Sequence, residues 1–400
     1  MSINQPIVIA GTGPAGSLLA LYLAQHDIPV IMLEKEAAIP IDLRASTFHP
    51  PSLEMLDELG VTEKLVAKGL VVTKYQYRDR QTNEVAEFDM AIVADETPFP
   101  FRLQLEQYEM TLIVNEMLKD YPHVDVRFCN KVIDSRQNGD SVEVDVETPS
   151  GVDTLVTPFL LGCDGASSNV RKSAGIGYGG FTYDEKFLVV STDFPFEEVF
   201  DNLAYVNYVA DPDEWCVILR TEKKWRVLWP TESSISDETY LSDEYIQERL
   251  NHLHSKEGDY DIGHRTLYNV HQRVSETYFN DRIVLAGDSC HINNPLGGMG
   301  MNGGLHDAHN LAVKLVEIIN GGADYIEKFK HYDRQRRELA VKFVQEHTIT
   351  NKKLMESTET DVQAARQKML METAADPVKA KAFVMERAMI DCVRDSLAVK

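Results

Sequence analysis

Two glycine-rich stretches, far apart in the chain, have the residue types and spacing for binding a nucleotide cofactor. A G-x-G-x-x-G begins at Gly11 inside IVIAGTGPAG, and another begins at Gly298 inside NNPLGGMGMNGG. Glycines at this spacing let the backbone approach phosphate closely, because no Cβ separates the backbone from the ligand. Either the chain has two dinucleotide sites, or the second run has another task.

The first run is flanked by the elements of a dinucleotide-binding unit. The apolar run at 7–10 predicts a buried strand, 15–26 has helical periodicity, and a second apolar run at 30–33 ends on Glu34. Glu34 can accept hydrogen bonds from ribose hydroxyls, and its charge disfavours NADP because a 2′-phosphate would be repelled. FAD and NAD both fit this unit.

The turn and the first helical residues of this unit are expected to face the cofactor. Gly11 allows the turn, Gly13 lets pyrophosphate approach, and Gly16 lets the helix pack closely on the strand. Free N–H groups and the helix dipole favour an anion at this helix N-terminus. The predicted cofactor contacts of the unit are Gly11, Gly13, Pro14, Ala15, Gly16, Glu34 and Lys35.

Three later stretches decide between FAD and NAD. LRASTFHPPSLEMLDELGV begins at residue 43, LGCDGASSNVRK at 161 and IVLAGDSCHINNPLGGMGMNGG at 283. With the first glycine run, these D-G and G-D motifs resemble, in order, the single-component FAD-dependent aromatic hydroxylases typified by para-hydroxybenzoate hydroxylase. The resemblance implies an α/β fold: a Rossmann-like FAD-binding domain, an interleaved β-sheet substrate domain and a C-terminal helical segment.

The resemblance also assigns cofactor contacts outside the first unit. Arg44 would reach a cofactor phosphate, and Asp164 of the D-G motif lies in the segment beside the pyrophosphate. Asp288 of the G-D motif would take the ribityl hydroxyls, and Gln107 would touch the ribityl chain. A turn aspartate and a solvated glutamine are the alternatives for the last two.

The second glycine run differs from a second nucleotide module. It lacks an adjoining strand before it and an acid at the end of a later strand, although a helical face follows from Leu305. By the resemblance, it would hold the isoalloxazine ring through Pro295, Gly297, Gly298, Gly300, Met301 and Asn302. NAD(P)H would then visit transiently, and the choice between NADH and NADPH stays open.

The chemistry implied by the resemblance is aromatic hydroxylation. A flavoprotein monooxygenase would use NAD(P)H and O2 to hydroxylate a phenolic or N-heteroaromatic small molecule through a flavin C4a-hydroperoxide. His49 is a candidate acid–base residue, with a capping or packing histidine as the alternative, and His291 is expected to brace the G-D loop. Tyr205, Tyr208 and Arg220 are candidates for the substrate pocket.

Two other functions fit parts of the pattern. One is a hydroxylase or reductase of a quinone or isoprenoid precursor. The other is a non-catalytic flavin-binding redox sensor, which would keep the FAD motifs but lose the stretch at 293–304. That stretch is intact.

The elements that must position these residues come from three parts of the chain. The FAD-binding domain is expected at 1–72, 101–180 and 265–340, and the substrate sheet at 73–100 and 181–264. GIGYGG at 175–180 is interpreted as a loop between domains. Residues 341–400 are expected to be helical and could cap the fold or mediate contacts in a homodimer.

Composition excludes several classes of protein. The 400 residues include 40 Lys and Arg against 63 Asp and Glu, a net charge of −23, which disfavours nucleic acid as a partner. The five cysteines are scattered without metal-ligand spacing. No apolar run reaches the roughly 18 residues of a membrane span, and no secretory signal opens the chain, so a cytoplasmic location is expected.

Overall fold

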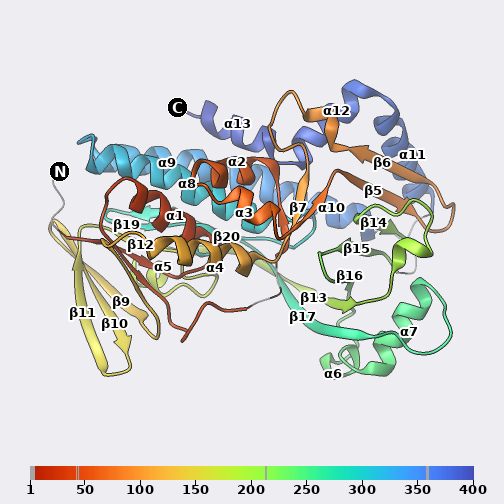
Figure 1. Ribbon diagram of the computed structural model, residues 1–400, viewed down its shortest axis with the longest axis horizontal. Coiled ribbons are helices and arrows are strands. Elements are labelled where there is room, and N and C mark those ends of the chain that lie inside the picture. Colours follow the sequence, from red (N-terminus) through yellow and green to blue (C-terminus); the bar gives the residue numbers. More distant parts are fainter. Residues whose placement is uncertain (1–4, 42, 44, 212–213, 357–359) are drawn as a thin grey trace.

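The computed structural model describes residues 5–41, 43, 45–211, 214–356 and 360–400. Two sheet regions lie side by side, and the C-terminal helices lie along one side of both (Figure 1). The hairpin strands β9 to β11 project at one end of the molecule, and the short helices α6 and α7 lie at the other.

The first sheet has the strand order β18-β19-β12-β1-β2-β8. Its strands are β18 (Phe279–Asn280), β19 (Ile283–Leu285), β12 (Leu160–Gly162), β1 (Ile7–Ala10), β2 (Val30–Leu33) and β8 (Val124–Arg127). All neighbours are parallel except β18 and β19. The carboxyl ends of parallel strands meet at one edge, and this edge collects the first glycine run, Glu34, the D-G motif and the G-D motif.

Helices cover this sheet because its strands are apolar on both faces. They are α1 (Pro14–Gln25), α4 (Gln107–Leu118), α5 (Asn169–Ser173), α8 (Met299–Ile319) and α9 (Tyr325–Leu339). Strands β9 (Lys131–Asn138), β10 (Ser141–Thr148) and β11 (Gly151–Thr157) form an antiparallel meander beside it. The strands predicted at 7–10 and 30–33 are confirmed with the same bounds.

The second sheet has the order β20-β17-β13-β16-β15-β14-β5-β6. Its strands are β5 (Lys74–Asp79), β6 (Val85–Asp89), β13 (Tyr178–Thr192), β14 (Val206–Ala210), β15 (Cys216–Arg220), β16 (Trp225–Pro230), β17 (Ile262–Ser275) and β20 (His291–Ile292). Strands β13 and β17 pair from Tyr178 to Thr192 and belong to both regions. The boundaries expected near 180 and 265 thus fall inside strands, and GIGYGG is partly strand rather than a loop, because long strands carry the chain between the regions.

Alternating side chains give the second sheet two different faces. The inner face carries Tyr75, Phe187 and Tyr208 and packs with Leu296 of the second glycine stretch. The outer face carries Trp225 and packs under α6 (Asp237–Tyr240) and α7 (Asp243–Leu253). The inner face is therefore the one that meets the cofactor motifs.

A small sheet joins the two regions. Strand β7 (Arg102–Gln104) pairs with β3 (Thr47–Phe48) and β4 (Leu70–Val72). Helices α2 (Pro50–Glu58) and α3 (Thr62–Val66) follow β3, and the single turns η1 (Met90–Val93), η2 (Phe196–Glu198) and η3 (Gly287–Ser289) lie elsewhere in the chain. This small sheet places β7 between the second glycine run and the inner face.

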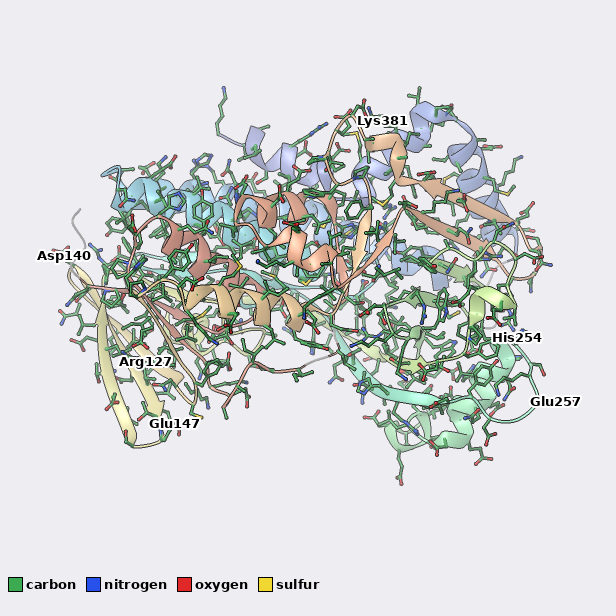
Figure 2. The ribbon with its side chains drawn as sticks, in the orientation of Figure 1. Arg127, Asp140, Glu147, His254, Glu257 and Lys381 are labelled. Atoms are coloured by element: carbon green, nitrogen blue, oxygen red, sulfur yellow. The ribbon has the colours of Figure 1, made fainter. Side chains whose placement is uncertain are left out.

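The C-terminal segment is helical, as predicted, and it caps the second sheet. It comprises η4 (Ala340–Glu346), α10 (His347–Glu356), α11 (Thr360–Ala375), α12 (Pro377–Arg387) and α13 (Ile390–Ala398). Phe383 stacks on Phe88 with ring centroids 4.5 Å apart, and Lys381 (Figure 2) pairs with Asp95 and Glu96 at 2.6 Å each. Across the described residues, helices long and apolar enough to cross a membrane are absent.

Candidate flavin and substrate site

The first glycine run forms a turn that only glycine permits at two positions. Gly11 has φ +101°, and a Cβ there would lie 2.4 Å from the Cys163 carbonyl oxygen. A Cβ on Gly16 would lie 2.1 Å from the Gly11 oxygen. Gly13 is different, because among the described residues no atom lies within 4 Å of its ideal Cβ. That open space at the start of α1 fits a pyrophosphate group.

Glu34 ties the end of β2 to this turn. It is 6% exposed, and one carboxylate oxygen accepts hydrogen bonds from the Thr12 backbone N–H at 3.0 Å and the Thr12 hydroxyl at 2.6 Å. The other oxygen accepts from the Glu36 backbone N–H at 3.0 Å. A carboxylate has about four lone-pair sites, so Glu34 keeps acceptor capacity for a ribose.

The D-G aspartate has a structural task that the sequence pattern did not indicate. Asp164 accepts hydrogen bonds from the Ser168 hydroxyl at 2.5 Å and from the backbone N–H groups of Asn169 and Val170 at 2.7 and 3.2 Å. It therefore holds the N-terminus of α5. Burial raises its pKa above the usual value, and these hydrogen bonds oppose that rise.

Arg171 links the D-G motif to the G-D loop. Its guanidinium donates to the backbone oxygens of Ser289 at 3.0 Å and Ala166 at 2.9 Å and lies 3.8 Å from the centre of the Tyr178 ring. Tyr178 in turn donates to the Asp288 carbonyl at 2.9 Å. The Asp288 side chain is exposed at this edge, which suits contact with ribityl hydroxyls.

The three motifs converge on one place. A Cβ on Gly287 would lie 3.0 Å from the Ala15 Cβ at the start of α1. A Cβ on Gly304, in the first turns of α8, would lie 3.1 Å from the Gly287 Cα. The G-D loop is thus packed between the two helices that follow the two glycine runs, and both runs border a single site.

The second glycine run turns into α8 through two residues with positive φ. Gly297 has φ +99° and Gly298, the N-cap, has φ +66°. The backbone N–H groups of the first helical turn, including that of Met301, have no acceptor inside the helix. The buried Asn302 side chain donates to the backbone carbonyls of Thr47 and Gly298 at 2.8 and 2.7 Å.

His49 is buried behind this run. Its Nε2 lies 2.9 Å from the Gly297 oxygen, and its backbone N–H donates to the Asn302 side chain at 2.9 Å. Burial, assisted by the charge of Arg102, lowers the pKa of His49 to about 3, so the ring is neutral at physiological pH. Among the described residues its Nδ1 has no partner. The position of His49 is that of a packing histidine, which was the alternative to an acid–base residue. An acid–base role for His49 stays a prediction.

A buried charge cluster braces the G-D loop. His291 Nε2 lies 2.7 Å from the Asp307 carboxylate, which also accepts from Arg336 Nε at 2.7 Å and from the Gly287 backbone N–H at 3.3 Å. The bracing role predicted for His291 is confirmed. Burial would raise the pKa of Asp307, but His291 and Arg336 outweigh burial and lower it to about 2. Asp307 and Arg336 were not identified from sequence, since neither lies in a motif.

The other predicted cofactor contacts are Arg44, Lys35, Gln107 and Pro295. Arg44 lies outside the described residues. The Lys35 side chain is exposed, and its amine lies 3.7 Å from the Glu36 carboxylate. Gln107 begins α4 half-buried, and its backbone N–H donates to the Ala45 oxygen at 3.0 Å. Pro295 is exposed, directly before the buried Leu296.

The structure separates the three predicted pocket residues. Tyr208 lies on the inner face of the second sheet, where it stacks on Tyr77 at 4.9 Å. Tyr205 and Arg220 lie near Trp225 on the outer face. The Tyr205 ring centre lies 6.2 Å from the centre of the Trp225 ring, and the Arg220 guanidinium lies 5.8 Å from it. The proposed pocket therefore keeps Tyr208 and leaves Tyr205 and Arg220 out, because alternation along β14 and β15 turns them away.

Sequence reasoning missed the polar residues of β7 and of the adjoining inner face. Arg102 on β7 is 3% exposed and lies 4.2 Å from the centre of the Tyr75 ring. Among the described residues, no partner is found for Arg102 Nε, the Tyr75 hydroxyl or Gln104 Nε2. The available signal was the alternation of Arg102 and Gln104 with apolar residues in FRLQL.

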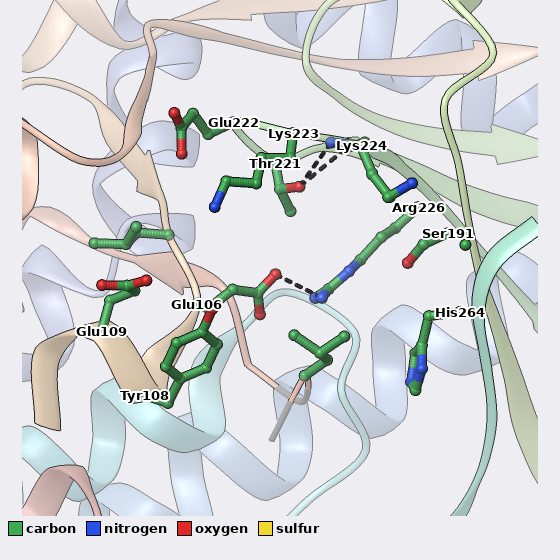
Figure 3. Close-up of a pocket in the computed structure, with 13 residues that line it drawn as sticks. Glu106, Tyr108, Glu109, Ser191, Thr221, Glu222, Lys223, Lys224, Arg226 and His264 are labelled. Atoms are coloured by element: carbon green, nitrogen blue, oxygen red, sulfur yellow. Dashed lines mark hydrogen bonds and ion pairs between the residues drawn. The ribbon is translucent and has the colours of Figure 1, made fainter. Parts of the chain in front are cut away.

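A cavity of about 190 Å³ opens between α4 and the inner face. Figure 3 shows Arg226 reaching across it to Glu106, at 2.5 Å, with Lys223 and Lys224 on the far wall. Leu43 and Glu106, which line it, directly precede the predicted flavin contacts Arg44 and Gln107. The cavity thus borders the expected flavin position.

This edge of the first sheet defines a nucleotide-binding flavoprotein. The open space at Gly13, the exposed Asp288 side chain and the glycine-rich start of α8 fit the pyrophosphate, ribityl chain and ring of FAD. The inner face of the second sheet packs with Leu296, beside the expected ring end of this site. Comparison with known proteins places the chain within this class.

A family model described as FAD binding domain matches residues 4–347, so the chain belongs to that family. It is 28% identical over 385 residues to a para-nitrophenol 4-monooxygenase of Pseudomonas sp. (strain WBC-3), covering 95% of this chain and 94% of that protein. It is 30% identical to a 6-hydroxy-3-succinoylpyridine 3-monooxygenase of Pseudomonas putida (strain DSM 28022 / S16), covering 84% and 86%.

A solved structure supports the same assignment. The crystal structure of a p-nitrophenol 4-monooxygenase from Pseudomonas putida DLL-E4 matches with a TM-score of 0.91 and 27% identity, covering 98% of this chain and 99% of that one. The chain is therefore a flavoprotein monooxygenase of the single-component aromatic hydroxylase group, with FAD as cofactor and NAD(P)H and O2 as co-substrates.

Proposed function

We propose that this enzyme hydroxylates a small, single-ring phenol or hydroxypyridine. The observation that carries the proposal is the aromatic inner face of the second sheet together with the adjoining strand β7. There, Tyr75, Arg102 and Gln104 carry polar atoms that have no partner among the described residues. Aromatic walls with a few polar groups are typical of a site that orients a flat ring. The names of the two relatives, a nitrophenol and a hydroxypyridine monooxygenase, agree with this size of substrate.

The residues of the chain would orient and shield the reaction. FAD, when bound, supplies the redox chemistry. The Met301 backbone N–H and the dipole of α8 would stabilise negative charge on the ring edge, and Pro295 would lie over the ring. The buried Asn302 and His49 side chains hold the loop that carries these groups. The apolar inner face keeps water away from the reacting ring.

Anaerobic flavin reduction tests the proposal directly. The holoenzyme is mixed with NADH or NADPH, with and without p-nitrophenol and a panel of hydroxypyridines, and turnover is repeated with isotopically labelled O2. We expect at least one aromatic compound to accelerate flavin reduction and to gain one labelled oxygen atom. A panel that yields neither acceleration nor oxygenated product would contradict the proposed substrate class.

Two further properties belong to the proposal. A cytoplasmic location is supported by the five cysteines, all of which are free thiols, as expected in a reducing compartment. A homodimer is proposed as the assembly, and light scattering at several protein concentrations would test it.

A further inference from the structure

Arg102 is a buried positive charge without an acidic partner among the described residues. It is 3% exposed, and its Nε has no hydrogen-bond acceptor among the described residues. Burial would lower its pKa, but the phenol groups of Tyr208, Tyr75 and Tyr77 stabilise the charge and raise the pKa above the usual value. None of the described carboxylates forms an ion pair with it. A buried charge of this kind is costly unless another charge compensates it.

The polar atoms around Arg102 are suited to an oxygen acceptor. Beside the guanidinium, the Tyr75 hydroxyl and Gln104 Nε2 also lack partners among the described residues. All three groups can donate hydrogen bonds, and the guanidinium and amide nitrogens can only donate. A site built from unsatisfied donors and one positive charge favours an anionic oxygen.

The walls of this site are aromatic. Tyr75 lies under the guanidinium at 4.2 Å and stacks on Phe88 at 5.4 Å, and Tyr208 stacks on Tyr77 at 4.9 Å. The site therefore offers flat apolar surfaces next to its positive charge. A planar aromatic anion matches both features.

The site also lies beside the proposed position of the flavin ring. Gln104, two residues after Arg102 on β7, accepts a hydrogen bond from the Thr47 hydroxyl at 3.0 Å. Thr47 in turn packs against Gly298, whose ideal Cβ would lie 3.1 Å from the Thr47 Cβ. Leu296, next to Pro295, belongs to the same apolar cluster as Tyr75 and Tyr208. Arg102 is thus held where a ring beneath the second glycine run would present its substituents.

We propose that Arg102 binds the ionised oxygen of the aromatic substrate, so that the enzyme selects phenolates and hydroxypyridine anions over neutral rings of the same size. The inference rests on the proposed function and names the form in which its substrate binds. Because the chain as a whole carries a charge of −23, which repels anions at long range, the selection depends on this local cation.

Equilibrium binding to the oxidised holoenzyme tests the selection without turnover. The probes are p-nitrophenol and its methyl ether, p-nitroanisole, which has nearly the same shape but cannot ionise. The p-nitrophenolate ion absorbs visible light differently from the neutral phenol, so difference spectra over a range of pH report the ionisation state of the bound ligand. We expect the wild type to bind p-nitrophenolate about 10- to 100-fold more tightly than the ether, the range for a charge-assisted hydrogen bond.

Variants assign the selection to Arg102. R102Q should lose most of this preference, and the bound phenol should ionise at a higher pH than in the wild type. R102K should keep part of the preference because it keeps the charge without the forked donor geometry. Y208F should weaken phenolate binding, whereas Y205F, on the outer face and 38% exposed, should not change it. Flavin absorbance of each variant confirms that the FAD site is loaded.

The outcomes separate this inference from the proposed function. A wild type that binds both probes equally, or binds neither, overturns the inference whether or not a variant folds. Phenol hydroxylation without any preference for the anion would leave the proposed function standing. Conversely, selective phenolate binding through Arg102 without an oxygenated product from any phenol or hydroxypyridine would refute the proposed function alone.

Discussion

At the residue scale, one carboxylate connects the parts of the flavin site. The Asp307 carboxylate is fully buried and forms hydrogen bonds with the His291 ring, the Arg336 guanidinium and the Gly287 backbone N–H. It joins the helix after the second glycine run to the loop of the G-D motif. Its removal would leave the Arg336 guanidinium buried without its counter-ion, which is more harmful than the loss of a surface pair.

We therefore predict that D307N lowers the free energy of unfolding by about 3–5 kcal/mol and weakens FAD retention. Urea denaturation followed by flavin and tryptophan fluorescence measures both effects. E116Q, which removes an exposed ion pair with Lys119, is the control and should change stability by less than about 1 kcal/mol. Equal effects of the two substitutions would show that the cluster is not structural.

The same residue gives a pH dependence with a definite sign. The pKa of Asp307 is about 2 in the folded chain and about 3.9 in an unfolded one. Because the folded pKa is depressed, the stabilisation is present above the unfolded value and is lost as pH falls toward 2. In wild type this contribution should disappear between about pH 4 and 2, and in D307N that part of the acid transition should be absent.

At the scale of elements, two glycines of the turn between β1 and α1 have different tasks. Gly16 is needed for the fold, and Gly13 for the expected cofactor site. Gly13 has an ordinary φ of −64° and open space at its Cβ, whereas a Cβ on Gly16 would overlap the backbone of Gly11. If pyrophosphate occupies the space at Gly13, a methyl group there blocks the ligand but not the fold.

We predict that G13A keeps the unfolding transition of the apoprotein and weakens FAD binding at least about 10-fold, or 1.4 kcal/mol. G16A should lose stability as well, because the α1 backbone must move away from the turn. G179A, where the ideal Cβ has only an ordinary contact of 3.7 Å, is the control for a glycine-to-alanine change. Flavin titration and thermal unfolding separate the effects, and full FAD affinity in G13A would place the pyrophosphate elsewhere.

At the scale of the whole molecule, the C-terminal helices pack behind the proposed substrate site. Phe383 of α12 stacks on Phe88, and its ring centre lies 6.0 Å from that of Tyr77. The Gln367 side chain of α11 donates to the backbone carbonyl of Tyr77 at 3.3 Å. Tyr77 belongs to the phenol groups around Arg102. The segment therefore packs against the proposed substrate site from outside, without belonging to the first sheet.

For F383A we predict a loss of about 2 kcal/mol of stability, less than the roughly 3–5 for a fully buried Phe, because Phe383 is half-buried. KM for the aromatic substrate should rise several-fold, while the FAD content stays that of wild type. Steady-state kinetics and flavin absorbance provide the two readouts. V378A in the same helix, at a side chain 79% exposed, should match wild type in both, and a loss of FAD in F383A would argue against the separation of the two regions.

Sequence alone determined the parts of this protein whose physics is local. Strand, glycine turn, helix and acid follow one another within 34 residues, so their periodicity can be read locally. The clash that a Cβ on Gly16 would make with the Gly11 oxygen also arises inside this unit. The order of the later motifs identified FAD, and the bracing role of His291 followed from its loop.

Only the tertiary structure decided which side chains meet across distance. Arg102, Asp307 and Arg336 lie in no motif, and their partners come from strands and helices far away in sequence. The face toward which Tyr205, Tyr208 and Arg220 point was likewise undetermined, because one residue of register turns a strand side chain to the opposite face. Local sequence thus predicts the residues of the flavin site, whereas long-range packing determines which charged and aromatic side chains surround the proposed substrate site.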